Sequence, residues 1–294
     1  MKKKILVIGG SGFIGSSLCN RLKKNYDVTN YDLNENIVPG IKYINGNIND
    51  VISVENAIKK NDYVFNLAGQ TELEESQTNP YAVFKNNVLG IINILNACKK
   101  YKIKRLIVAS TVYVYSNLGG YYSISKKCAE QITKEYSKRH KLKYTIIRFG
   151  SIYGPGARKG NAIYDILKMA VNKKKISYWG TGDERREYIH VDDATKGCMD
   201  ILEKRYENKT IMCSGMQSTK VSDMLVMIKE IFNNKIKIEY RKNSRAAWHY
   251  KITPYQIEED NCYKLNLDSY IDFGKGVIDL INYLKEKKIN ERTS

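Results

Sequence analysis

The sequence has few residues of the kinds that bind metals in closely spaced sets. It contains three histidines and six cysteines in 294 residues, and the cysteines form no CxxC pair and no cluster with a histidine. These residues are Cys19, Cys98, Cys128, Cys198, Cys213 and Cys262, with His140, His190 and His249. Because structural zinc requires closely spaced ligand pairs, we expect no metal site. Unpaired, mostly buried thiols are typical of a reducing compartment, which favours a cytoplasmic protein.

Long apolar runs are also missing. No stretch approaches the roughly 18 uninterrupted apolar residues that a membrane-spanning helix needs. The run at residues 5–8, Ile-Leu-Val-Ile, is too short for a signal peptide. No repeat of fixed period, low-complexity tract or flexible linker is evident. We therefore expect no membrane partner, and the length predicts one large domain or two smaller ones.

The charge balance is strongly basic. Lys and Arg number 49 against 31 Asp and Glu, which gives a net charge of +18. Such an excess is typical of proteins that bind nucleic acid, an anionic membrane surface or a phosphorylated substrate. The lysines are nevertheless scattered, and no basic segment is interleaved with aromatic residues as RNA binding would require. We interpret the excess mainly as a compositional bias and expect no nucleic-acid partner.

Strand-like and helix-like segments alternate through the first half of the chain. Apolar runs predict strands at residues 4–8, 27–32, 41–44, 62–68, 105–110 and 144–148. Helical spacing of apolar residues predicts helices at 16–22, 52–58, 81–100 and 123–140. This alternation predicts an α/β fold, a Rossmann-type doubly wound parallel sheet.

The rhythm changes after residue 150. Residues 151–157 are rich in turn formers, and a helix-like segment follows at about 162–171. We predict a cofactor-binding domain at 1–150 that also receives part of residues 187–217. Residues 151–294 would then form mainly a smaller, interleaved C-terminal domain that binds the substrate.

A glycine-rich loop follows the first predicted strand. Gly9, Gly12 and Gly15 are spaced so that one permits a tight turn, one admits a pyrophosphate and one lets the helix pack closely on the strand. The amino end of the next helix would offer N–H groups and a positive dipole end to the phosphates. Asp32 ends the second predicted strand, where a carboxylate binds the adenosine ribose hydroxyls and repels a 2′-phosphate. Since Leu33-Asn34 follows rather than a cation, the pattern favours NAD over NADP.

A tyrosine and a lysine lie four residues apart after the fifth predicted strand. Tyr122 and Lys126 would share one face of a helix. A nearby ammonium favours the phenolate and so makes the tyrosine a better acid or base at neutral pH. The hydroxyl of Thr111 would form a hydrogen bond with the substrate oxygen whose proton Tyr122 exchanges. With 23 tyrosines in the chain, the position in a dinucleotide fold carries this assignment more than the spacing does.

These motifs together resemble the extended short-chain dehydrogenases/reductases, in the NAD-dependent epimerase/dehydratase family that acts on nucleotide sugars. The resemblance covers essentially the whole chain. It rests on the residues just described and on Asn66–Gly69, Asn87, Ser110, Arg148–Pro155 and Arg186–Val191.

The resemblance implies a role for each matched position. Thr111, Tyr122 and Lys126 match the catalytic trio. Cofactor contacts are implied for Gly9, Gly12, Phe13, Ile14, Asp32, Asn47, Ile48, Leu67, Ala68, Gly69 and Phe149, besides Tyr122 and Lys126. Substrate contacts are implied for Ser151, Asn161, Tyr178 and Arg186, besides Thr111 and Tyr122. For Tyr178 a core aromatic, and for Arg186 an ion pair with Glu184 or Glu187, remain open alternatives.

The chain also departs from the family pattern. Val112 and Tyr113 stand where the family's 4,6-dehydratases have acidic residues, which disfavours dehydration. The connection at residues 116–121 is short, and Ser151 replaces a common Asn. The sugar-binding pattern at residues 241–250 is only partly matched, with Arg245 as a candidate.

The resemblance implies NAD-dependent redox chemistry at C4 of a nucleotide-diphosphate sugar, foremost 4-epimerisation through a transient 4-keto intermediate. A 4-keto-sugar reductase or a sugar dehydrogenase is the alternative enzyme, and a non-catalytic dinucleotide-binding regulator is the alternative outside enzymes. A homodimer formed by the helices near 81–100 and 123–140 is also implied.

Overall fold

The structure, a computed structural model, describes residues 2–35, 38–241, 249–255 and 262–293. They divide into two compact units, each treated separately below. The first unit comprises Met1–Phe149, Thr195–Cys213 and Tyr255–Leu265. The second comprises Gly150–Ala194, Ser214–Pro254 and Asn266–Ser294.

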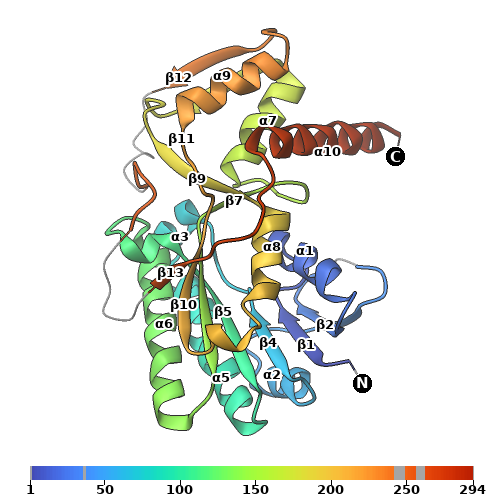
Figure 1. Cartoon of the computed structure of the whole chain (residues 1–294), viewed down its shortest axis with the longest axis vertical. Coiled ribbons are helices and arrows are strands. Elements are labelled where there is room, and N and C mark those ends of the chain that lie inside the picture. The colour runs from blue at the N-terminus through green and yellow to red at the C-terminus, as the bar shows by residue number, and fades with distance from the viewer. Residues whose placement is uncertain (1, 36–37, 242–248, 256–261, 294) are drawn as a thin grey trace. The chain divides into compact units, whose positions relative to one another are not determined.

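An eight-stranded parallel sheet forms the centre of the first unit (Figure 1). Among the described residues its order is β13-β10-β6-β5-β4-β1-β2-β3. The strands are β1 (Lys4–Ile8), β2 (Asp27–Asp32), β3 (Lys42–Asn45), β4 (Tyr63–Asn66), β5 (Arg105–Thr111), β6 (Tyr144–Phe149), β10 (Lys209–Cys213) and β13 (Cys262–Lys264). The order reverses between β1 and β4, and this switch point is where doubly wound sheets bind nucleotides. The predicted fold class is confirmed, although the sequence revealed six of these strands and missed β10 and β13.

Helices connect the strands. They are α1 (Phe13–Leu22), α2 (Val51–Ile58), α3 (Leu73–Thr78), α4 (Pro80–Phe84), α5 (Gly90–Lys100) and α6 (Gly120–His140), with the short turns η1 (Lys85–Leu89), η2 (Val112–Tyr115) and η3 (Lys204–Tyr206). The single helix predicted at 81–100 is instead interrupted, because η1 is a π-helical turn. Asn87 lies in this wider turn, and its buried side chain bonds to Gln70 and Ser125.

Successive residues of the central strands point to opposite faces of the sheet, and both faces are buried. Leu6, Val64 and Leu106 belong to one apolar cluster, which includes Ile94 and Leu95 of α5. Their neighbours Ile5, Phe65 and Ile107 are equally inaccessible. Burial on both faces explains why these strands are continuous apolar runs in the sequence.

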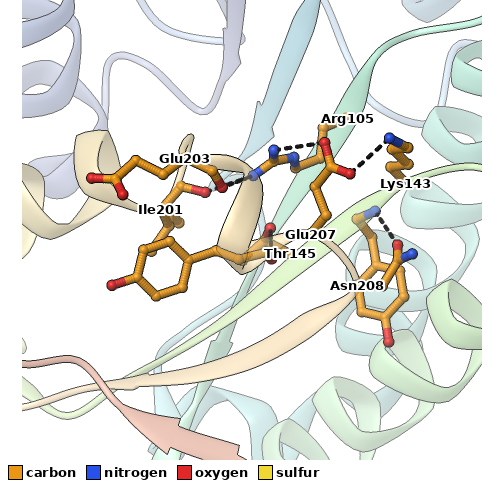
Figure 2. A network of polar contacts seen from close by, with 9 residues as sticks. Arg105, Lys143, Thr145, Ile201, Glu203, Glu207 and Asn208 are labelled. Carbon is orange, nitrogen blue, oxygen red and sulfur yellow. Dashed lines mark hydrogen bonds and ion pairs between the residues drawn. The ribbon is translucent and has the colours of Figure 1, made fainter.

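A polar network holds the returning segment 195–213 against the sheet (Figure 2). Arg105, at the start of β5, donates to the carbonyls of Ile201 at 2.7 Å and Glu203 at 3.1 Å. It also bonds to the Glu207 carboxylate at 3.0 Å, which Lys143 contacts from the other side at 2.7 Å. The segment then continues as β10 beside β6.

The second unit contains two small sheets. One has the order β11 (Ser218–Lys220), β9 (Arg185–His190) and β7 (Ser151–Tyr153), and the other pairs β12 (Lys237–Arg241) with β8 (Lys175–Trp179). Its helices are α7 (Ala162–Lys173), α9 (Val221–Ile231) and α10 (Phe273–Thr293). Helix α8 (Val191–Asp200) begins in this unit and ends in the first.

Candidate functional site

The glycine loop after β1 has a backbone that only glycine fits. Gly9 has a φ of +83°, and a Cβ there would lie 2.6 Å from the backbone nitrogen of Ala68. Gly15 lies in the first turn of α1, where a Cβ would collide with the carbonyl oxygen of Gly9. Gly12 caps α1 without a side chain, so the first N–H groups of the helix receive no side-chain bond from their cap. Phe13 and Ile14 open that helix.

Asp32 is tied to the same loop. One carboxylate oxygen accepts from the backbone N–H of Ser11 at 3.0 Å, and the other from that of Asn34 at 3.0 Å. These bonds hold the carboxylate beside the loop at the end of β2. Two carboxylate oxygens can each accept further bonds, so Asp32 keeps the capacity to bind hydroxyl groups.

Other predicted cofactor residues lie at or just after the ends of three strands of this sheet, β3, β4 and β6. Asn47 and Ile48 follow β3, and the side-chain amide of Asn93 donates a hydrogen bond to the carbonyl of Ile48 at 3.0 Å. Leu67, Ala68 and Gly69 follow β4, and Gly69 has a φ of +157° beside the Asn87 amide. Phe149 is buried at the end of β6.

These features fit a dinucleotide. The glycines leave most of the loop backbone without side chains at the start of α1, and the carboxylate of Asp32 lies beside it. The helix end and the bare loop suit a pyrophosphate, and the carboxylate suits a ribose diol.

Tyr122 and Lys126 lie on α6 against the end of β5. The Lys126 ammonium donates to the carbonyl of Ala109 at 3.1 Å. The Tyr122 ring meets the Tyr113 ring edge-on, with 6.3 Å between centroids. Thr111, which ends β5, accepts from the backbone N–H of Tyr113 at 3.3 Å. The structure thus brings the predicted trio to one end of one strand.

Burial changes the acidity of Lys126. Its side chain is almost fully enclosed, and desolvation lowers its pKa to about 8, partly offset by the charge of Glu130. A lysine in this range is still mostly protonated at neutral pH, and its charge is poorly screened because water is excluded. Such a cation favours a phenolate on the same helix face.

A buried charged cluster next to this trio escaped the sequence analysis. Glu130 binds Arg148 through two bonds, 2.6 and 2.9 Å long, and accepts from the Ser110 hydroxyl at 2.5 Å. The guanidinium of Arg148 also lies 4.5 Å from the centre of the Tyr115 ring. Two signals pointed to it: Glu130 follows Lys126 by four residues, and Arg148 is a charge inside an apolar strand.

Two predicted substrate residues of the second unit meet around Tyr250. The Ser151 hydroxyl lies 3.3 Å from the Tyr250 hydroxyl, and the Arg186 guanidinium lies 4.4 Å from the centre of its ring. Arg186 also donates to the carbonyl of Lys251 at 3.1 Å. Tyr250 is almost fully buried and was not among the predicted residues. It is far from both partners in sequence, so no local pattern could have indicated it.

The other two predicted substrate residues have structural contacts of their own. Asn161 caps α7 by accepting from the N–H of Tyr164, and it donates to the carbonyl of Ile152 at 2.7 Å. The Tyr178 hydroxyl donates to Glu184 at 3.1 Å, and burial together with that carboxylate raises its pKa. Arg245 lies outside the described residues.

The short connection before α6 packs on Tyr113. Gly119 has a φ of +88°, and a Cβ there would lie 2.8 Å from the Tyr113 ring. The Ser123 hydroxyl bonds to the carbonyl of Tyr113 at 2.9 Å. Tyr113 therefore occupies a fixed place beside Tyr122.

Comparison with known proteins identifies the class. The model of the NAD dependent epimerase/dehydratase family matches residues 5–213. The chain therefore belongs to this family of NAD-dependent enzymes, and the predictions of the family and of NAD are confirmed.

Individual relatives differ in reaction. The chain is 28% identical to a putative UDP-glucose 4-epimerase of Methanocaldococcus jannaschii, over 98% of this chain and all of that protein. It is 32% identical to a dTDP-D-glucose 4,6-dehydratase of Dictyostelium discoideum, over 69% of this chain and 56% of that protein. The chain thus spans little more than half the length of the dehydratase.

Among solved structures, the fold is similar to that of a UDP-glucose 4-epimerase from Thermotoga maritima, solved with UDP-glucose. The TM-score is 0.84 at 22% identity, and the match covers 97% of this chain and 99% of that chain. At this identity the likeness establishes the fold. Separately, none of the helices in the described part of the chain is long and apolar enough to cross a membrane.

Proposed function

We propose that the chain catalyses the NAD-dependent 4-epimerisation of a nucleotide-diphosphate sugar. The observation that carries the proposal is the buried Lys126, which lies on the same face of α6 as Tyr122. Its ammonium donates to the carbonyl of Ala109 in β5, and both residues belong to the same unit as the glycine loop. The relative from M. jannaschii, named a putative UDP-glucose 4-epimerase and matched over its whole length, supports this reaction, and the similar T. maritima structure is that of a UDP-glucose 4-epimerase.

The cofactor would be held by the bare loop Gly9–Gly12, the start of α1 and the carboxylate of Asp32. Asn47 and Ile48 would border the adenine, and Leu67–Gly69 and Phe149 would lie along the rest. When bound, NAD would supply reversible two-electron oxidation at C4 of the sugar.

The protein's own groups would move the proton. Tyr122, as phenolate, would accept the proton of the C4 hydroxyl and later return it to the 4-keto oxygen. Lys126 would stabilise the phenolate by its charge. Thr111 would bond to the same oxygen and hold it in line with Tyr122.

Residues of the second unit would bind the nucleotide diphosphate. Arg186 offers a planar set of donors that suits phosphate oxygens, and its contact with Tyr250 orients it. Ser151 and Asn161 would supply polar contacts, and Tyr178 an aromatic face. Asn161 already accepts a hydrogen bond that caps α7 and donates one to the carbonyl of Ile152.

Dehydration is not part of the proposed reaction. Elimination of water needs a group that protonates the leaving hydroxyl, and Val112 and Tyr113 provide no carboxylic acid after Thr111. The Tyr113 phenol instead packs edge-on against Tyr122.

One experiment separates the candidate reactions. Purified protein is incubated with UDP-glucose and with other nucleotide sugars, without added cofactor, and products are analysed by chromatography and mass spectrometry. Epimerisation yields a product of unchanged mass, and dehydration one that is lighter by a water. In parallel reactions with added cofactor, reduction adds two hydrogens and consumes NAD(P)H, whereas oxidation removes two hydrogens and consumes NAD(P)+. A product of changed mass would refute the proposal. Activity in a Tyr122→Phe variant equal to that of the unaltered chain would favour a non-catalytic role for the trio.

A homodimer formed through α4, η1, α5 and α6 is proposed with this function. Large apolar side chains are exposed on these elements: Tyr81 at 75%, Leu89 at 54% and Ile124 at 51%. Light scattering after size exclusion should give twice the chain mass, and Leu89→Asp should give the monomer. A monomeric unaltered chain would contradict this.

A further inference from the structure

Three side chains follow one another along a single face of α6. Tyr122, Lys126 and Glu130 are separated by four residues each, which places them one above the next. All three are buried, with exposed fractions of 8%, 7% and 2%. The carboxylate therefore lies one turn beyond the ammonium, in surroundings where charge is poorly screened.

The position of Glu130 is fixed from two strands. Ser110 and Arg148 are register partners in β5 and β6, and both bond to the carboxylate. Ser110 lies between Ala109, whose carbonyl holds Lys126, and Thr111. The same strand end thus holds both the ammonium and the carboxylate.

We propose that Glu130 is a positioning residue for the reaction: its carboxylate, held by Arg148 and Ser110, keeps Lys126 charged, and so keeps Tyr122 competent as a proton acceptor. This proposal rests on the proposed function of Tyr122 and Lys126. Glu130 itself would touch neither the sugar nor the cofactor, because its oxygens are bonded to the two strands.

Among the described residues, groups from β6, η2, η1 and the loop after β4 border this row. Arg148 faces Glu130 from β6, and the Tyr115 ring of η2 lies over the guanidinium. The η1 turn and the loop after β4 contribute neutral groups, the Asn87 amide and the backbone of Gly69. The charge of Glu130 opposes the fall in the pKa of Lys126 that burial causes.

The test compares three variants. Glu130→Gln removes the carboxylate but keeps its shape. Glu130→Gln/Arg148→Met removes both charges and leaves no unpaired buried ion, so it should fold even where the single variant does not. Arg148→Lys keeps both charges of the pair and changes only its packing and hydrogen bonds. The first readout is the pH profile of kcat/KM. The second, which needs no turnover, is the ultraviolet titration of the Tyr122 phenolate, obtained by subtracting the spectrum of the matching Tyr122→Phe protein.

Loss of the carboxylate should move the alkaline limb of the profile downward by about one pH unit, since Lys126 would lose its proton earlier. The Tyr122 titration should move upward by a similar amount. Both shifts should occur in Glu130→Gln and in the double variant, and not in Arg148→Lys. Glu207→Gln is the matched control, because it alters the ion pair at the other end of β5, about 17 Å from Ser110 along the strand. It should leave both readouts unchanged.

Two results would overturn the inference. One is an unshifted titration in the double variant. The other is a shift in Arg148→Lys equal to that in the double variant, which would assign the effect to packing of the pair instead of to the carboxylate. If no nucleotide sugar is turned over, the proposed function fails, yet the titration still decides whether Glu130 controls Lys126 and Tyr122.

Discussion

Replacement of Arg105 by Met should strongly destabilise the first unit. The Arg105 side chain is 3% exposed and connects the start of β5 to three acceptors in the segment 195–213 (Figure 2). Methionine fills a similar volume but donates no hydrogen bond. The carbonyls of Ile201 and Glu203 and one oxygen of Glu207 would each lose a bonding partner.

The magnitude follows from what remains after the substitution. Removal of one partner of a buried ion pair typically costs about 3–5 kcal/mol. Glu207 is 22% exposed and keeps its bond to Lys143, so its charge is not stranded. The loss of stability should therefore fall near the lower limit, about 3 kcal/mol. Against a usual total of about 5–15 kcal/mol, the variant should still fold.

Urea unfolding followed by circular dichroism measures this loss, with each unit's transition fitted separately if two are seen. Hydrogen exchange should locate it, because amides of β10 would exchange faster than those of β1. Arg139→Met is the control. Arg139 pairs with Glu135 on the surface of α6, with exposed fractions of 70% and 48%, and its loss should cost under about 0.5 kcal/mol. A cost below about 1 kcal/mol for Arg105→Met would refute the reasoning.

The ion pair between Arg105 and Glu207 also predicts how the stability gained from Arg105 depends on pH. The hydrogen bond from Lys143, followed by the bond from Arg105, lowers the pKa of Glu207 in the folded state. A carboxylate with a lowered pKa contributes stability above its unfolded value of about 4.3, and this stability is lost as pH falls through the folded value. The difference between the unaltered chain and Arg105→Met should therefore shrink below about pH 4. A difference in stability between the two proteins that stays constant down to pH 3 would contradict this role of Glu207.

Three further predictions concern the cofactor and the reaction. Gly15→Ala would place a methyl group against the Gly9 carbonyl, so NAD affinity measured by calorimetry should fall at least about tenfold, and unchanged affinity would show that the loop adapts. Asp32→Asn should weaken NAD binding by about tenfold and reduce the preference of the protein for NAD over NADP. Competition binding with the two cofactors would test both effects. Turnover should decline above about pH 8, where Lys126 loses its charge. Turnover that stays constant through pH 9 would exclude stabilisation of the Tyr122 phenolate by the Lys126 ammonium.

The sheet was predictable wherever a strand forms one long apolar run. Strands such as β1 and β5 are buried on both faces, so their sequences show it without reference to the rest of the chain. β13 has only three described residues, Cys262–Lys264, and pairs at the edge of the sheet, where exposure weakens the pattern. β10 is apolar, but it follows a long excursion through the second unit, and nothing local places it beside β6.

The site divides in the same way. Gly9, Gly12, Gly15 and Asp32 are close in sequence, and the backbone geometry of a strand, loop and helix dictates them. Tyr250 contacts Ser151, which is 99 residues away in the sequence, and Arg186, which is 64 residues away. These contacts depend on tertiary folding, which no rule of local spacing describes.

The row on α6 shows how a weak pattern becomes specific. A tyrosine followed by a lysine four residues later means little in a chain with 23 tyrosines. A carboxylate four residues further on is different, because a buried glutamate needs a cation and donors to compensate its desolvation. Arg148 and Ser110 meet that need from strands flanking the site. If Glu130 acts as proposed, the phenolate, ammonium, carboxylate and guanidinium alternate in sign, and each charge is stabilised by the next. The Tyr-x-x-x-Lys-x-x-x-Glu spacing, with an arginine near the end of the following strand, then describes an electrostatic unit that the pair alone does not.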